Sequence, residues 1–182
     1  MVVAAFRVSP VPPLRWAGGA WVEVVRNTPL TVQLVIFYFG FTKLGVRYSG
    51  FASGVIVISA YTSAFLAETI RSGINTVARG QAEAARAIGL TFPQTLMLVV
   101  LPQALRSVVG PIGNIFIALM KNTSVIGGTI SVLELTKTSH NLVTDTAQPV
   151  AVFMGAGIAY LLVTIPSGYA FGWIETRVAV RR

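Results

Sequence analysis

The sequence predicts an all-α, polytopic helical membrane protein. Of its 182 residues, 54% are hydrophobic and only 11% are charged, and the mean hydropathy is +0.72. A soluble domain carries roughly 25% charged residues, so this deficit indicates that lipid is the surrounding solvent. A membrane-crossing helix needs about 20 mostly apolar residues. We therefore expect four spans, at residues 28–44, 51–70, 96–120 and 149–173.

The four runs differ in how evenly apolar they are. Run 28–44 is apolar apart from Thr31, Gln33 and a late Thr42-Lys43 pair. Run 51–70 carries one acid, Glu68, near its end. Run 96–120 is interrupted by Pro102, Arg106 and Pro111, whereas run 149–173 contains no charged residue.

The distribution of Lys and Arg predicts the orientation, because basic residues accumulate on the cytoplasmic side of a membrane. With four spans, both chain ends and the loop after residue 70 lie on the same side. That side carries nine basic residues: Arg7, Arg15, Arg26, Arg71, Arg79, Arg86, Arg177, Arg181 and Arg182. The opposite side carries three: Lys43, Arg47 and Lys137. We expect the ends and the loop after residue 70 to be cytoplasmic.

Composition also excludes several classes of function. The chain has no cysteine, so it forms no disulfide and no thiolate metal site. One histidine and one aspartate leave little for acid–base or metal chemistry. Its basic residues are scattered rather than gathered on one face, which argues against nucleic-acid binding. The phosphate-binding loop of ATPases is absent from the sequence. We expect no catalytic residue, cofactor or metal in this chain.

A polar, alanine-rich segment interrupts the apolar pattern. We predict a cytoplasmic helix over residues 74–90, because alanine is the strongest helix former. Within it, Glu83 and Arg86 are three residues apart and are expected to pair. Gly89 suits a left-handed C-terminal cap. A second helix is expected to begin directly afterwards, with Thr91 as its N-cap.

This segment resembles the EAA loop of ABC-importer permeases, which docks onto the ATP-hydrolysing subunit. The resemblance rests on the spacing of Glu83-Ala84-Ala85, Gly89 and Leu101-Pro102. It implies one transmembrane domain over residues 1–182 with the type I ABC importer permease fold, and a coupling loop at about 73–95. It also implies that residues 83–89 form the coupling helix. The alternative is an ordinary surface loop with fortuitous alanines.

Other stretches resemble permeases for polar amino acids: residues 26–33, 61–68, 71–74 and 121–124. Residues 7–11 and 73–77 are most similar to glutamate-uptake members. The resemblance implies import of a polar, glutamate-like amino acid by alternating access across the bacterial cytoplasmic membrane. Implied partners are ABC ATPase subunits that hold ATP and Mg²⁺, a second identical or paralogous permease chain, an extracytoplasmic amino-acid-binding protein and membrane lipid. Residues 125–130 depart from the family pattern.

Two groups are candidates for substrate contact. Lys121, Asn122, Thr123 and Ser124 combine an ammonium, hydroxyls and an expected free helix end, which together could bind an amino-acid carboxylate. Alternatively, Lys121 reaches the interface and the next three residues form a turn. Glu68 either contacts the substrate's ammonium or pairs with Arg71, and we favour the pair.

Small-residue spacing predicts close helix packing at Gly50/Gly54 and at Gly168/Gly172, and residues 110–113 predict a bend. Residues 1–6 resemble the tail of a helix. Polar amino-acid permeases typically have five spans, so we expect a further span upstream; the alternative is a four-span protein.

Two other classes of function are weighed against an importer subunit. A self-contained secondary transporter or channel would need internal repeats or a proton relay, and we find neither. An intramembrane enzyme would need a Ser/His pair, paired aspartates or a metal triad, and the single His140 and Asp145 lie outside the expected spans.

Overall fold

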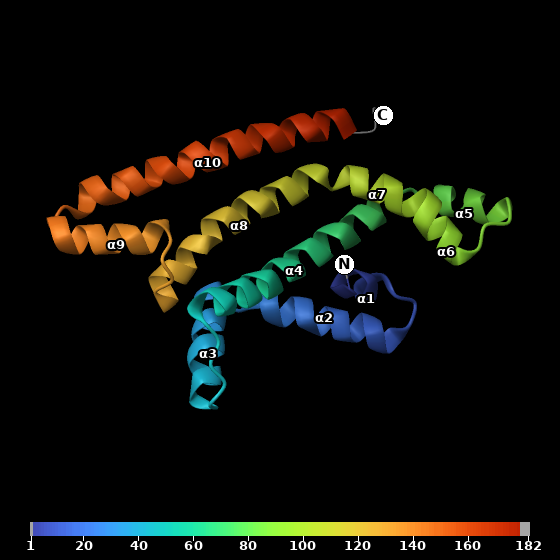
Figure 1. The fold of residues 1–182 in the computed structure, drawn as a ribbon. Coiled ribbons are helices and arrows are strands. Elements are labelled where there is room, and N and C mark those ends of the chain that lie inside the picture. The colour runs from blue at the N-terminus through green and yellow to red at the C-terminus, as the bar shows by residue number, and fades with distance from the viewer. Residues whose placement is uncertain (1, 179–182) are drawn as a thin grey trace.

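The computed structural model describes residues 2–178, and every regular element among them is helical, as predicted (Figure 1). In chain order the elements are α1 (Val2–Val8), α2 (Pro12–Asn27), α3 (Leu30–Lys43), α4 (Gly50–Thr76), α5 (Arg79–Ala87), α6 (Phe92–Thr95), a π-helical turn η1 (Leu96–Val100), α7 (Leu101–Ser107), α8 (Val109–Ile130), α9 (Leu135–Thr146) and α10 (Pro149–Val178).

Three helices of the described chain are long and apolar enough to cross a membrane: α4, α8 and α10. The first of the four expected spans is a shorter apolar helix, α3. Its 14 residues reach about 21 Å, against the roughly 30 Å of a bilayer's hydrocarbon core. Pro29 separates it from α2, and the positive φ of Gly45, 83°, lies just beyond its other end.

The third expected span, 96–120, is divided and displaced. It begins as η1 and α7 and breaks at Val108, where φ is −108° and ψ is 4°. Pro111 lies in the first turn of α8, where a missing backbone N–H costs no hydrogen bond. Pro102 directly follows the π-helical turn η1 within a continuous helical run, and such a turn is a usual accompaniment of an interrupted hydrogen-bond ladder. Helix α8 then continues to Ile130, so the expected end at residue 120 is wrong.

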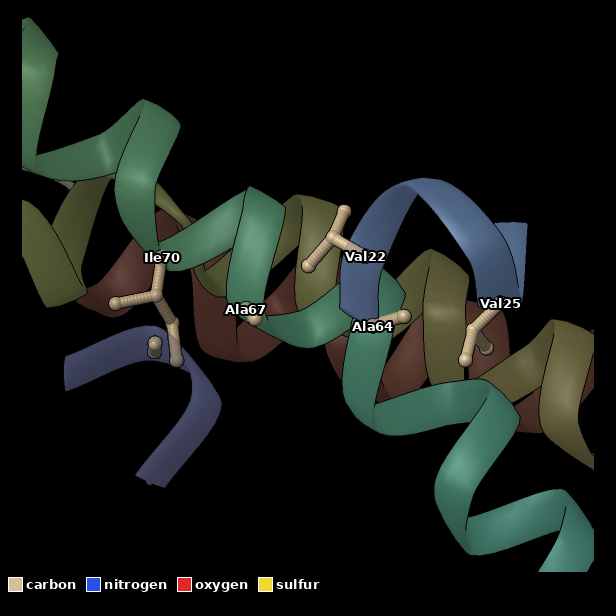
Figure 2. Close-up of a cluster of buried hydrophobic side chains, with 6 residues drawn as sticks. Val22, Val25, Ala64, Ala67 and Ile70 are labelled. Carbon is tan, nitrogen blue, oxygen red and sulfur yellow. The ribbon is translucent and has the colours of Figure 1, made fainter. Parts of the chain in front are cut away.

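Helix α4 is the centre of the structure. One buried cluster joins it to α1 and α2 through Ala4, Val22, Val25, Ala64, Ala67 and Ile70. Figure 2 shows Val22 and Val25 of α2 lying against the small side chains of Ala64 and Ala67 on α4. A second cluster joins α4 to α3 and α8 through Leu30, Leu34, Val57, Ile58 and Ile130. Helix α10 packs on α8 and α9.

The surroundings of the glycines confirm the predicted close helix packing at Gly50/Gly54 but not at Gly172. A Cβ built on Gly54 would lie 2.8 Å from the Ile126 side chain, so α4 and α8 touch there. Gly172 has nothing within 4 Å, so the second pair does not pack closely along its length. The expected bend falls at Val108 instead of within residues 110–113. Gly113 of that segment is instead pressed against Phe171 of α10.

Candidate functional site

The predicted coupling segment forms a helical hairpin, which we define as residues 77–95. The expected single helix over 74–90 is wrong, because α4 runs on to Thr76 and the extended backbone of Val77 and Ala78 separates it from α5. Gly89 adopts the predicted left-handed conformation, with a φ of 91°. Thr91 then caps α6 as expected: its Oγ1 accepts a hydrogen bond from the Gln94 backbone N–H.

The outer face of this hairpin carries mainly small side chains and charged side chains that are not among the ion pairs of residues 2–178. Ala85 is buried, whereas Glu83 and Ala84 are exposed and Ile88 at the turn is 80% exposed. The expected pair between Glu83 and Arg86 is not among the ion pairs formed by residues 2–178. Arg86 instead donates from Nε to the Ala82 carbonyl over 3.4 Å. The hairpin therefore offers small side chains, the charges of Arg79, Glu83 and Arg86, and the apolar side chains of Ile88 and Phe92 to its surroundings.

The base of the hairpin lies where α4 contacts α7 and Val108. A Cβ on Gly73 of α4 would lie 2.3 Å from Val108 and 2.9 Å from the Ala104 carbonyl oxygen. Thr76 Oγ1 also donates to Ser107 Oγ over 3.2 Å. Leu101 and Pro102, the end of the EAA pattern, open α7 at this contact. Helices α4 and α7 are therefore in backbone-level contact where the hairpin joins them.

A cavity of about 610 Å³ lies between α4, α8 and the segment that joins α8 to α9. Most of its lining is apolar, with Ser59, Thr62, Ser63 and Thr123 as hydroxyl groups and Glu134 as the charged group. Pockets of roughly 300–1,000 Å³ with apolar walls and a few polar groups are typical of small-molecule sites. This cavity is the candidate substrate site.

Glu134 is held in a fixed position in this cavity. Its Oε1 accepts from the Lys137 backbone N–H over 2.7 Å, which caps α9, and its Oε2 accepts from the Tyr160 hydroxyl over 3.1 Å. The bare backbone of Gly127 makes room for the carboxylate. Glu134 is not among the site residues predicted from the sequence. A signal was available, because Glu134 and Asp145 are the two acids on the predicted outer side.

The predicted substrate residues 121–124 are only partly brought together. Thr123 lines the 610 Å³ cavity, and Asn122 lines a smaller neighbouring one. Lys121 is exposed and points away, about 200° around the helix from Thr123 at 3.6 residues per turn. The Ser124 hydroxyl donates to the Lys121 carbonyl. The expected helix end and the alternative turn are both wrong, because α8 is helical throughout this segment.

Glu68 forms the ion pair that we favoured, and a second one besides. Its Oε1 accepts from Arg71 Nε over 2.8 Å, and its Oε2 accepts from Arg7 Nη2 of α1 over 2.9 Å. Two guanidinium groups therefore occupy both carboxylate oxygens, on the side of α4 that faces α1. In this structure Glu68 links α1 to α4.

The fold is that of a helical membrane protein with an exposed hairpin at one end of its long helices and a cavity between α4 and α8. Residues 1–180 match the family described as binding-protein-dependent transport system inner membrane component, and the chain belongs to that family.

Relatives with similar sequences support a narrower class. The chain is 39% identical over 178 residues to the "Probable glutamine ABC transporter permease protein GlnM" of Bacillus subtilis, covering 98% of this chain and 82% of the relative. It is 38% identical over 196 residues to the "Glutamate transport system permease protein GluC" of Corynebacterium glutamicum, covering 100% and 85%. It is 37% identical to the "L-cystine transport system permease protein TcyB" of Bacillus subtilis, covering 90% and 70%.

Solved structures of ABC transporters have folds similar to that of this chain. The "Crystal structure of an amino acid ABC transporter with histidines" matches with a TM-score of 0.90 at 30% identity, covering 96% of this chain and 81% of that one. The MetNI methionine ABC transporter shares the fold, with a TM-score of 0.80 at 20% identity, covering 98% and 84%. The chain is thus the membrane permease subunit of an amino-acid ABC importer, a transport component.

Proposed function

We propose that this permease carries a polar amino acid of the glutamate type, a class in which we include its amide, glutamine. The observation that supports this is the 610 Å³ cavity with the fixed carboxylate of Glu134. A carboxylate in an apolar, partly closed cavity favours a cation, and the α-ammonium of an amino acid supplies one. The hydroxyls of Ser59, Thr62 and Thr123 can bind the polar side chain.

The charge of the cavity bears on which member of this class is carried. Glu134 is the charged group among its lining residues, so no cation there would balance a side-chain carboxylate. This favours glutamine over glutamate as the substrate. The relatives named for glutamine and for glutamate are about equally similar to this chain. Competition between the two amino acids in an uptake assay decides between them.

The energy for transport comes, in this proposal, from ABC ATPase subunits that bind ATP and Mg²⁺ and dock on the hairpin around Glu83, Ala84, Ala85 and Gly89. The exposure of Glu83, Ala84 and Gly89 and the firm attachment of the hairpin to α4 and α7 support this role. In Figure 1 the hairpin and α9 lie at opposite ends of the long helices. An extracytoplasmic amino-acid-binding protein would therefore dock near α9. A second permease chain would complete the pathway in the bacterial inner membrane.

The substrate role is tested by Glu134→Gln in the assembled transporter, reconstituted in proteoliposomes with its ATPase and binding protein. Glutamine keeps a carbonyl oxygen to cap α9 but loses the negative charge. We expect the amino-acid concentration for half-maximal uptake to rise at least tenfold, because a hydrogen bond to a charged group contributes roughly 1.5–3 kcal/mol.

Asp145→Asn is the matched control, because Asp145 is an exposed acid on the same predicted side and is not among the residues that line the cavity. Its uptake should stay at the wild-type level. Wild-type uptake kinetics in the Glu134→Gln transporter would contradict the proposed site.

A further inference from the structure

Three cavities follow α4 in a row. The first is the 610 Å³ cavity. The second, about 280 Å³, shares Thr62 and Leu119 with the first and is also lined by Phe65 and Asn122. The third, also about 280 Å³, shares Phe65 with the second and is otherwise lined by α2. The row thus leads from the candidate substrate site past Phe65 to the surface of α2.

The α2 side of the third cavity carries opposite charges that do not neutralise each other. Glu23 and Arg26 are three residues apart on the helix, a spacing that normally allows an ion pair. Within residues 2–178 neither joins an ion pair. Glu23 Oε2 instead accepts from Asn27 Nδ2 over 3.0 Å, and the Arg26 guanidinium lies 5.2 Å from the centre of the Phe65 ring. Both charges keep free hydrogen-bonding capacity.

Phe65, which adjoins these charges, belongs to a helix long enough to cross a membrane. Helix α4 has 27 residues and is therefore about 40 Å long, which exceeds a hydrocarbon core of roughly 30 Å by about 10 Å. Thr76, the cytoplasmic end of α4, is about 16 Å from Phe65 along the axis. For an upright α4 whose whole excess projects into the cytoplasm, Phe65 lies about 6 Å inside the core. Glu23 and Arg26 are exposed side chains, and both line the third cavity next to Phe65. Ionisable groups that line a cavity beside a membrane-spanning helix often mark substrate paths.

We propose that Glu23, Arg26 and Asn27 form a second binding site for the amino acid on its way to the cytoplasm, the α2 site. The carboxylate of Glu23 binds the α-ammonium, and the guanidinium of Arg26 binds the α-carboxylate. Phe65 separates the α2 site from the cavity that holds Glu134. The α2 site recognises the zwitterionic backbone common to all α-amino acids, so it adds little side-chain selectivity. This inference rests on the proposed function.

The absence of cysteine from the sequence makes a direct test possible. Asn27→Cys places a single thiol in this chain at the α2 site. Ala17→Cys, an exposed position of α2 outside the site, is its matched control. In the complete transporter in nanodiscs without ATP, the rate of modification by a cationic methanethiosulfonate reagent is followed on this chain by mass spectrometry. The probes are L-glutamine, L-glutamate and N-acetyl-L-glutamine, which lacks the ammonium.

We expect saturating L-glutamine or L-glutamate to slow modification of Asn27→Cys about tenfold, while N-acetyl-L-glutamine gives no protection and Ala17→Cys is unaffected. Adding Arg26→Gln should raise the concentration for half-protection roughly tenfold, the factor for one charge-assisted hydrogen bond.

Two results would overturn the α2 site. One is an equal rate with and without amino acid, or equal protection by the N-acetylated probe. The other is a thiol that stays unmodified in the assembled transporter, with or without amino acid, but reacts in the isolated chain. That result would make this surface a contact between permease chains. If Glu134→Gln still weakens uptake, only the α2 site fails. If Glu134→Gln has no effect, the proposed function fails independently.

Discussion

Gly89 offers the sharpest test of the coupling hairpin. Its φ of 91° lies in the left-handed region, and a Cβ built on it would meet nothing within 4 Å. Gly89→Val therefore introduces backbone strain without a steric clash. An L-residue in this region costs roughly 1–2 kcal/mol, and a β-branched one lies at the upper end.

Strain of this size is enough to change the shape of the turn. An energy of about 1–2 kcal/mol corresponds to a 5- to 30-fold change in an equilibrium ratio. Because the turn lies outside the packed clusters around α4, we expect the chain to insert and fold normally. The geometry of α5 relative to α6 should change, and with it the fit of the hairpin to the ATPase. Uptake should be lost.

The assay is ATP-driven amino-acid uptake in proteoliposomes, with ATP hydrolysis measured in the same samples. Gly45→Val is the matched control, since Gly45 has a φ of 83°, also meets nothing within 4 Å and lies on the predicted outer side. Gly89→Asn is the second control, because asparagine tolerates the left-handed region. Both controls should retain most of the uptake.

Normal uptake by Gly89→Val would refute the argument that this turn couples ATP hydrolysis to transport. Equal loss in Gly45→Val and Gly89→Val would refute it as well, since backbone strain anywhere would then suffice.

Three further predictions concern the membrane helices. Gly54→Leu should push α4 away from Ile126 at a cost of about 1–3 kcal/mol, lowering both the thermal stability in detergent and uptake, whereas Gly172→Leu, with open space around it, should change neither. Glu68→Gln leaves the two partly buried guanidinium groups of Arg7 and Arg71 without a counter-charge. The free energy of unfolding should fall by about 1.5 kcal/mol, which lowers the Tm by roughly 3–6 °C. An unchanged Tm would show that the ion pairs contribute nothing to stability. Lys121→Met should lower uptake if Lys121 contacts the substrate from a neighbouring wall, and wild-type kinetics would remove it from the site.

Local features of the chain could be predicted because neighbouring residues produce them. The turn at Gly89 depends on the backbone freedom of one glycine. The cap at Thr91 depends on a hydroxyl that lies three residues before the backbone N–H of Gln94. The pair between Glu68 and Arg71 depends on one helical turn. The end of α8 could not be predicted, because a run of polar residues is typical of a turn in sequence. In the structure the Thr123 and Ser124 hydroxyls bond to carbonyl groups of their own helix, and the helix continues.

The sequence alone determined that this is an all-helical membrane protein with a polar, alanine-rich segment between its apolar helices, since composition and spacing decide which residues enter lipid and which remain in water. The tertiary structure decided which polar groups meet. Glu134 reaches the Thr123 cavity, Arg7 reaches Glu68, and Glu23 and Arg26 adjoin Phe65 only because helices distant in sequence pack around α4. Such contacts depend on packing between helices, which periodicity within one helix does not specify.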